Sequence, residues 1–183
     1  MIEKLKLAFR EPKRIVVYLL GIIAPIIPDR LYLRMLFRAQ MGYKLNLDNP
    51  QTFSERLQWL KLYNRKPEYT QMVDKYEAKK YVAGIIGEEY IIPTLGIWDS
   101  VDDIDFDALP NQFVLKTTHG GGNTGIVICR DKSTLDIPKA KAKLKKSLGK
   151  CIYRQFREWP YKNVKRRIIA ETLIGDGQIN DYK

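Results

Sequence analysis

Lys116 and three consecutive glycines place phosphate-binding chemistry in one short segment. The sequence F-V-L-K-T-T-H-G-G-G-N-T-G-I-V-I (113–128) predicts a strand, a glycine-rich turn and a second strand. A tight hairpin needs only two positive-φ positions, and additional glycines let backbone N–H groups approach an anion. A lysine entering the loop adds a point charge. The segment alone leaves two interpretations open, a flexible hairpin and a phosphate site formed by Lys116, Gly120, Gly121 and Gly122.

This segment differs from the two common phosphate-binding fingerprints. No Gly-Lys-Ser/Thr ending follows the glycines, and a strand rather than a helix comes next. His119 stands directly before the glycines. It is either a hydrogen-bond donor to phosphate or a structural residue of the loop.

Lys75 and Lys79 are candidates for the same ligand. Asp74 is predicted to begin a helix that ends near Gly84 or Gly87, so the two lysines lie four residues apart on one helix face. No acid stands three or four residues from either lysine, so no helical ion pair accounts for them. Because like charges at this spacing are mildly unfavourable, the pair favours an anionic ligand over two solvated surface lysines.

Other helix signals are local and clear. Thr52 and Glu55 have the spacing of a capping box, which predicts the start of an amphipathic helix. Asp136 is predicted to cap a lysine-rich helix that continues to Gly149.

Strand signals follow the first helices. We predict a short strand at 90–93, ended by proline, two strands flanking the glycine loop, a strand at 166–174, and the beginning of another at 178–183. The chain is thus predicted to be of the α/β class in its α+β form, with N-terminal helices before a mostly antiparallel sheet that contains a glycine-rich hairpin. The predicted divisions are an N-terminal basic and apolar extension (1–48), a middle region (49–110) and a part that contains the glycine loop (111–183).

The composition excludes some classes of site and partner. Two cysteines and one histidine in 183 residues cannot form a zinc or disulfide framework, which indicates a reducing cytoplasm. The net charge is +11, and residues 139–167 contain twelve Lys or Arg and one acid. No nucleic-acid-binding module is recognisable there. We expect a solvated helix face, and no binding to nucleic acid.

Residues 15–27 form the longest apolar run and follow a basic cluster at 4–14. The run is shorter than the roughly 20 residues that cross a bilayer. A signal peptide, a membrane-surface helix and a helix packed on the domain are the three interpretations. We expect residues 1–42 to make peripheral contact with a membrane surface or a partner, at the inner face of the membrane.

The order of these elements is similar to that of the ATP-grasp superfamily. A helix lysine, a strand lysine, a glycine-rich hairpin and a later strand, I-I-A-E, follow one another. The chain further resembles the TupA-like ATP-grasp family over roughly residues 43–183. The segments that carry this resemblance are 49–63, 74–82, 113–122, 157–163, 168–171 and D-Y-K at 181–183.

The resemblance implies that ATP is the ligand. Lys75, Lys79 and Lys116 would then contact its phosphates together with the glycine loop, Glu171 would bond its ribose or adenine, and Lys183 would face the phosphates. This chain departs from the family at the loop, where His-Gly-Gly-Gly stands in place of an expected Gly-Ser-Gly after the histidine. The departure removes one hydroxyl donor.

The resemblance also implies a reaction and a pathway. Such enzymes phosphorylate a carboxylate, which an amine then attacks, and the family is associated with cell-surface polymers such as teichuronopeptide. An acidic saccharide or polymer is the implied acceptor. Mg²⁺ is expected in the complete enzyme. In the superfamily its ligands lie well beyond the hinge that contacts adenine, and the I-I-A-E strand (168–171) of this chain would enter that hinge. Asp176, Asn180 and Asp181 are too close to that hinge to match them.

The chain is therefore expected to be a fragment that lacks the C-terminal catalytic part, with a degenerate, non-catalytic copy as the alternative. In either case we expect no ligase turnover of its own, and no catalytic residue or metal ligand is assigned. Two alternatives remain. A glycosyltransferase of the same pathways would bind a sugar nucleotide, but the Asp103-Ile104-Asp105 sequence lies in an acidic spacer rather than in a metal-binding strand–loop context. A basic interaction module without catalysis is the other.

Overall fold

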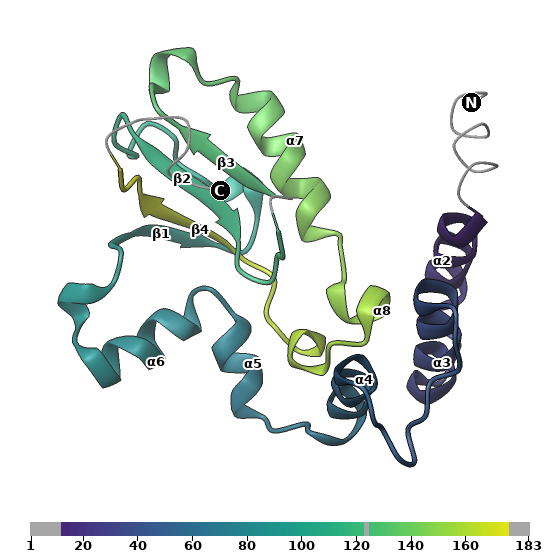
Figure 1. The fold of residues 1–183 in the computed structure, drawn as a ribbon. Coiled ribbons are helices and arrows are strands. Elements are labelled where there is room, and N and C mark those ends of the chain that lie inside the picture. The colour runs from purple at the N-terminus through teal and green to yellow at the C-terminus, as the bar shows by residue number, and fades with distance from the viewer. Residues whose placement is uncertain (1–11, 123–124, 176–183) are drawn as a thin grey trace. The chain divides into compact units, whose positions relative to one another are not determined.

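The computed structural model describes residues 12–122 and 125–175 of the chain (Figure 1). The contacts divide these residues into two compact units. Residues 12–66 with 151–162 form the first unit, and 67–122, 125–150 and 163–175 form the second. The three-part division of the sequence stays a prediction. The strand expected at 178–183, and Lys183 with it, lie outside the described residues.

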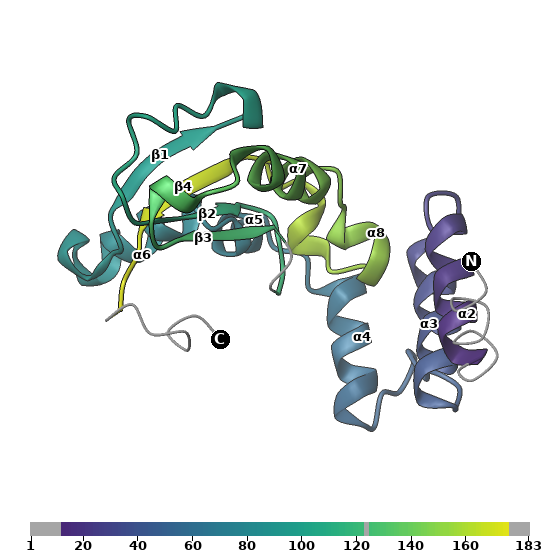
Figure 2. The ribbon, with the colours of Figure 1, turned by 90° about the horizontal axis from the view of Figure 1, so that it is seen from above.

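The first unit is helical (Figures 1 and 2). Its helices are α2 (Pro12–Ile23), α3 (Asp29–Met41), α4 (Phe53–Tyr63), α8 (Ile152–Phe156) and the 3₁₀ turn η4 (Trp159–Lys162). The buried side chains of α3 join two clusters, one with α2 and one with the segment before α4. The first contains Leu20, Ala24, Tyr32 and Leu36, and the second contains Leu33, Phe37, Leu45 and Leu47. None of the helices in the described residues is long and apolar enough to cross a membrane.

Local sequence signals explain where α4 begins. The side chain of Thr52 accepts a hydrogen bond from the backbone N–H of Glu55 at 3.2 Å, and Glu55 Oε2 accepts from the backbone N–H of Thr52 at 3.0 Å. This reciprocal pair satisfies two backbone donors that a helix start leaves unpaired. The predicted capping box is confirmed.

Arg157 connects α8 to the turn between α2 and α3. Its buried guanidinium donates to the carbonyls of Ala24 and Ile27, and its Nε lies 2.9 Å from Asp29 Oδ1. The same group lies 4.1 Å from the centre of the Tyr32 ring. An arginine with this many partners fixes the turn through charge, hydrogen bonds and ring stacking together.

The second unit contains a four-stranded sheet within the described residues, with strand order β1-β4-β2-β3 and every pairing antiparallel. The strands are β1 (Thr94–Trp98), β2 (Phe113–Thr117), β3 (Ile126–Cys129) and β4 (Ile168–Thr172). Helices α5 (Glu68–Val73), α6 (Glu77–Ile86) and α7 (Ile137–Leu148) and the 3₁₀ turns η1 (Glu88–Tyr90), η2 (Val101–Asp103) and η3 (Lys132–Thr134) accompany them. The chain is therefore mixed α+β, with N-terminal helices before an antiparallel sheet.

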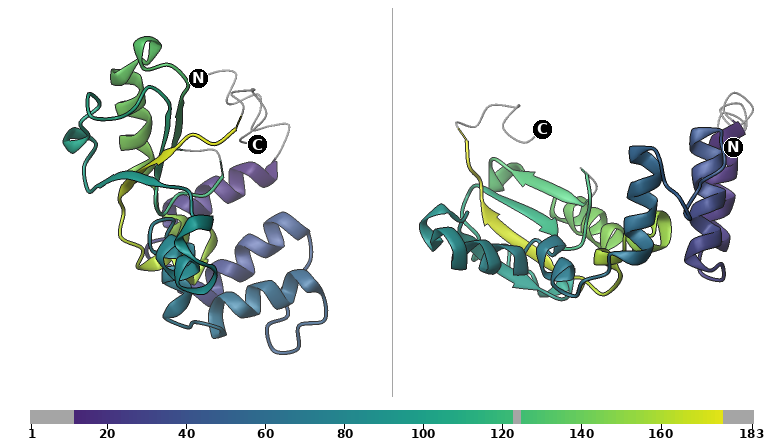
Figure 3. Two further views of the ribbon diagram at one scale, coloured as in Figure 1. Left: turned by 90° about the vertical axis from the view of Figure 1, so that its left-hand side faces the viewer. Right: turned by 60° about the horizontal axis from the view of Figure 1, so that its bottom comes forward.

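Helix α7 lies against one face of this sheet, and the two faces carry different side chains (the ribbon is shown in Figures 1 and 3). One face carries Phe113, Leu115, Ile168 and Ala170, which form an apolar core with Ala140 and Leu144 of α7. Alternation along β2 and β4 places Val114, Lys116, Ile169 and Glu171 on the other face. Charged groups therefore stand on the face away from α7.

One predicted strand is wrong. Residues 88–90 form η1, and the strand begins only after Pro93, at Thr94. Pro93 has no N–H for a ladder, but its carbonyl accepts from Thr172 N at 3.2 Å. Pairing with β4 consequently continues beyond the proline rather than ending at it. The strands around the glycine loop, the strand within 166–174 and the Asp136-capped helix are confirmed.

Candidate functional site

Glu171 lies between two lysines on the charged face of the sheet. Its Oε1 is 2.8 Å from Lys79 Nζ, and its Oε2 contacts Lys116 Nζ. The Glu171 side chain is 5% exposed, while those of Lys79 and Lys116 are 15% and 20% exposed. The carboxylate is thus deeply placed, and the two ammonium groups lie nearer to solvent.

The sheet register explains this arrangement. Val114 of β2 pairs with Glu171 of β4, and Lys116 pairs with Ile169, so Lys116 and Glu171 are diagonal neighbours on one face. Diagonal positions lie about 7–8 Å apart at the backbone, which a lysine side chain can span. Lys79 reaches the same carboxylate from α6.

Lys75 contacts the glycine loop and interacts with this cluster through its charge. Its Nζ donates to the carbonyl of Gly120, and its backbone N–H donates to the Thr118 carbonyl at 3.0 Å. Burial lowers the pKa of Lys75, and the positive charge of Lys116 lowers it further, while the charges of Asp74 and Glu171 act in the opposite direction. The protonated amine is therefore held where its charge is disfavoured.

The start of α6 differs from the prediction. Lys75 lies in the turn before the helix, which begins at Glu77, so it does not share a helix face with Lys79. Asp74 Oδ1 accepts from the N–H groups of Tyr76 and Glu77, and these bonds bend the chain into the helix. The prediction that the helix begins at Asp74 is therefore wrong: Asp74 shapes the turn before α6, and the helix begins three residues later, at Glu77.

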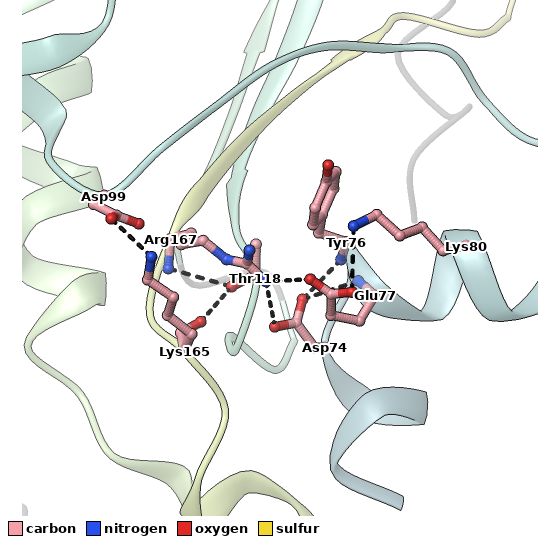
Figure 4. A network of polar contacts seen from close by, with 8 residues as sticks. All are labelled: Asp74, Tyr76, Glu77, Lys80, Asp99, Thr118, Lys165 and Arg167. Atoms are coloured by element: carbon pink, nitrogen blue, oxygen red, sulfur yellow. Dashed lines mark hydrogen bonds and ion pairs between the residues drawn. The ribbon is translucent and has the colours of Figure 1, made fainter. Parts of the chain in front are cut away.

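Arg167 fastens this turn to the sheet (Figure 4). Its Nη2 lies 3.1 Å from Asp74 Oδ2 and 2.9 Å from Glu77 Oε1, and its guanidinium is 4.9 Å from the centre of the Tyr76 ring. Burial opposes the charge, but hydrogen bonds to Glu77 and Asp74 raise the pKa of Arg167. The bond from Arg167 in turn lowers the pKa of Glu77. One arginine before β4 thus fixes the segment that carries Lys75 and Lys79.

Thr118 completes this connection (Figure 4). Its hydroxyl donates to the Lys165 carbonyl at 2.9 Å. Its backbone N–H donates to the Arg167 carbonyl, also at 2.9 Å. The side chain is fully buried. Since the Thr118 carbonyl accepts from Lys75 N, this residue links the glycine loop, the turn before α6 and the segment before β4.

His119 points into the unit. Its buried Nε2 lies 3.2 Å from the carbonyl of Lys150, just after α7. Burial lowers the pKa of His119, and the positive charge of Arg166 adds to the effect. These contacts describe an anchor for the loop, and its role as a phosphate donor stays a prediction.

The glycines of the loop have unequal conformations. Of Gly120, Gly121 and Gly122, Gly122 has a positive φ, +59°, while Gly125 at the end of the loop has φ +81°. A Cβ at Gly122 would meet no atom within 4 Å, whereas one at Gly125 would collide with the Ser147 side chain. Gly125 is therefore required by close packing on α7, and Gly122 by its backbone conformation.

The structure thus brings most of the predicted residues together. Lys79 and Lys116 both contact Glu171, Lys75 contacts Gly120, and the charge of Lys75 interacts with those of Lys116 and Glu171. His119 is turned towards α7, and Lys183 lies outside the described residues. Within residues 12–122 and 125–175 no group of three or more His, Cys, Asp or Glu side chains is arranged to hold a metal ion.

Comparison with known proteins decides the family. The sequence model of the family described as TupA-like ATPgrasp matches residues 55–183. The chain belongs to the TupA-like ATP-grasp family. Membership implies binding of ATP, and the matched region includes every predicted contact residue of the site. No curated protein and no solved structure matched this TupA-like chain in the same comparisons.

Sequence reasoning missed the residues that position this TupA-like site. In the sequence, Arg167 is one of many cations in the basic stretch 139–167 and Thr118 is one residue of the loop motif. Neither position by itself indicated a structural role. A usable signal for Arg167 was its place directly before the I-I-A-E strand. An arginine that enters a buried strand needs acidic partners, and Asp74 and Glu77 were the acids at the helix start.

Proposed function

We propose that this chain is the ATP-binding part of an ATP-grasp enzyme of the carboxylate–amine ligase type. The gathering of Lys75, Lys79 and Lys116 around Glu171 and the glycine loop carries the proposal. Three ammonium groups and one carboxylate leave an excess of positive charge at the end of the sheet. A polyphosphate neutralises such an excess.

The electrostatics of Lys75 support a polyanion as the ligand. Its pKa is lowered by burial and by the charge of Lys116. An anion bound beside Lys75 favours the protonated form and removes this penalty. A lysine in a balanced structural ion pair would experience no such penalty, so the residues present fit a triphosphate.

The residues have distinct roles in this proposal. Lys75, Lys79 and Lys116 hold the phosphates, and the backbone of the glycine loop adds neutral donors. Glu171 holds Lys79 and Lys116 in place, and its carboxylate oxygens keep lone pairs for a ribose or adenine donor. ATP, once bound, supplies the phosphoryl group that activates a carboxylate, and Mg²⁺ is the metal that such chemistry uses.

The wider role that we propose follows from the family. TupA-like proteins are associated with cell-surface polymers, and an acidic saccharide or polymer would provide the carboxylate. The net charge of +11 favours an anionic acceptor through long-range attraction. The reaction would take place in the cytoplasm, at the inner face of the membrane.

Calorimetric titration of the full chain tests the nucleotide. We expect ATP to bind, and Lys116→Ala to weaken binding by about 1–3 kcal/mol, as for loss of a charged hydrogen-bonding partner. Lys143→Ala is the matched control, since Lys143 is an exposed lysine of α7. It should leave the affinity unchanged.

Two results would contradict the proposal. Equal ATP affinity in Lys116→Ala and Lys143→Ala would remove the cluster from the binding site. Thermal protection by a uridine diphosphate sugar but not by ATP would indicate a glycosyltransferase, and protection by neither would leave a basic interaction module.

A further inference from the structure

Helix α2 presents a second apolar face that is exposed among the described residues of its unit. One face packs on α3 through Leu20 and Ala24, which are 3% and 1% exposed. The exposed apolar residues of this segment are Ile15, Val16, Tyr18, Leu19, Ile22, Ile23 and, just after the helix, Ile26. At about 100° per residue these positions cover nearly half of the helix circumference, opposite the packed face.

This face carries no charge in its described part. Between Ile15 and Ile26 the sequence has no charged residue at all. Leu19 is 53% exposed, Ile22 58% and Ile26 83%. Contiguous apolar surface of this kind on a water-facing helix marks a contact with a membrane or another protein.

The neighbouring helix supplies positive charge. Arg34 and Arg38 of α3 are exposed beside the apolar residues Leu31 and Met35. The axes of packed helices lie about 8–10 Å apart, which is comparable with the Debye length of about 10 Å, so these arginines can attract anionic groups around α2 from the helix layer behind it.

The one acid of this hairpin is turned inward. Residues 12–41 contain five Lys or Arg and one acid, Asp29, which gives a net charge of +4 (5 − 1). Asp29 accepts from Arg65 at 2.7 Å and from Tyr153 at 2.6 Å, and it pairs with Arg157. Outside this segment, Asp48 pairs with Arg30 at 2.6 Å and lies 3.8 Å from Arg34, which leaves Arg38 as the exposed arginine of α3 without an acidic partner in the described residues.

An exposed apolar helix face beside positive charge fits an anionic bilayer better than a second copy of this chain. A second copy of the chain would bring two hairpins of charge +4 against each other. An anionic bilayer instead accepts the apolar face among its acyl chains and attracts the arginines to its headgroups. The 12-residue α2 is shorter than the roughly 20 residues of a spanning helix, so the fitting geometry is in the plane of the interface.

We propose that the α2–α3 hairpin binds the surface of an anionic lipid bilayer, with the Leu19–Ile22 side of α2 inserted among the acyl chains. This would hold the nucleotide-binding unit close to the membrane. The proposal does not depend on ATP binding.

Flotation of the full chain with lipid vesicles tests it. We expect retention on phosphatidylcholine vesicles that contain phosphatidylglycerol, and little retention on phosphatidylcholine alone. Raising the salt from about 0.1 M to about 0.5 M should reduce retention severalfold, because screening shortens the attraction.

Two variants locate the contact. Leu19→Glu with Ile22→Glu should reduce retention about tenfold, because charge is costly among acyl chains. Ile85→Glu is the matched control, since Ile85 is an apolar residue of α6 with 66% exposure; it should behave as the unchanged chain does. Arg38→Glu should lower retention only on the anionic vesicles. Circular dichroism and thermal unfolding must show that each variant is folded.

Three results would overturn the proposal. Retention of the double variant equal to that of Ile85→Glu would remove α2 from the contact. No retention of the unchanged chain on anionic vesicles would exclude the bilayer. Concentration-dependent dimers that disappear in the double variant, without vesicle binding, would assign the face to a second copy. ATP titration of the double variant keeps this test separate from the nucleotide site, which it should leave intact.

Discussion

Lys79 and Glu171 are 92 residues apart in the sequence and form an ion pair of 2.8 Å, in which the glutamate is almost fully buried. Lys116 holds the other carboxylate oxygen. Removing one member of such a group leaves the others buried without a counter-charge, which costs more than the net value of the intact pair. The cluster is therefore sensitive to neutralisation of its only acid.

Glu171→Gln is expected to destabilise the fold while strengthening binding of inorganic tripolyphosphate. The loss should be about 1–3 kcal/mol in the free energy of unfolding, reduced from the value for a fully buried pair because both lysines reach solvent. Freed from the carboxylate, Lys79 and Lys116 would meet the phosphates with their full charge. Urea unfolding and calorimetry measure the two effects.

The same variant tests whether Glu171 touches the nucleoside. If it does, the affinity for ATP relative to tripolyphosphate should fall in Glu171→Gln. A ratio unchanged from that of the native chain would leave Glu171 with the single task of holding the lysines.

Arg167→Met should loosen the segment that carries Lys75 and Lys79. The variant leaves Asp74 and Glu77 without their shared partner, and we expect a loss of about 2–4 kcal/mol in unfolding free energy. Arg167→Lys keeps the charge but not the fork that reaches both acids, so it should recover part of the loss. Arg166→Met is the control at an exposed neighbouring arginine.

If Arg167 has only a structural role, substituting it should change the free energy of unfolding and leave the ATP affinity of the folded protein unchanged. We expect Arg167→Lys, measured where it remains fully folded, to bind ATP more weakly than the native chain and to bind it with a larger unfavourable entropy. Native affinity in that variant would mean that the turn before α6 keeps its position without the fork.

Local signals in the sequence predicted the helix starts well. A capping residue and the backbone donor it satisfies lie within three positions of each other, as at Thr52 and at Asp136. Such contacts form whatever the rest of the chain does. The strand at 90–93 failed for the opposite reason, because pairing with β4 from across the sheet decides where β1 begins.

The site was predictable only in part for the same physical reason. Residue types and order indicated Lys75, Lys79, Lys116 and Glu171, and the family motif supplied their roles. Contacts across long separations, such as Arg167 with Asp74, have no periodicity or spacing by which a sequence reveals them. The inward direction of His119 likewise depends on where α7 ends, which only the packed sheet determines.

Triphosphate affinity should fall at alkaline pH through Lys75. In the free protein its pKa is lowered, so it begins to lose its proton below the ordinary value of 10.5. A bound polyanion raises that pKa, and binding therefore takes up a proton wherever free Lys75 is partly neutral. Calorimetry in buffers of different ionisation enthalpy should show this uptake. Lys75→Arg, which stays charged, should lose the uptake, and its persistence there would assign it to another group.

Unfolding free energy should fall as the pH decreases from about 7.5 to about 5.5, because of His119. Its folded pKa is lowered from 6.5, so the unfolded chain binds a proton in this range while the folded chain does not. Stability then falls with decreasing pH by at most about 1.4 kcal/mol per pH unit. His119 is the only histidine of the chain, and lowered carboxylate pKa values, such as that of Glu77, act below 4.5.

Urea titrations of the untagged chain should show this slope. His119→Gln should be less stable near neutral pH and nearly flat across the window, and an equal slope in both proteins would show that the ring is not held neutral by its burial against α7.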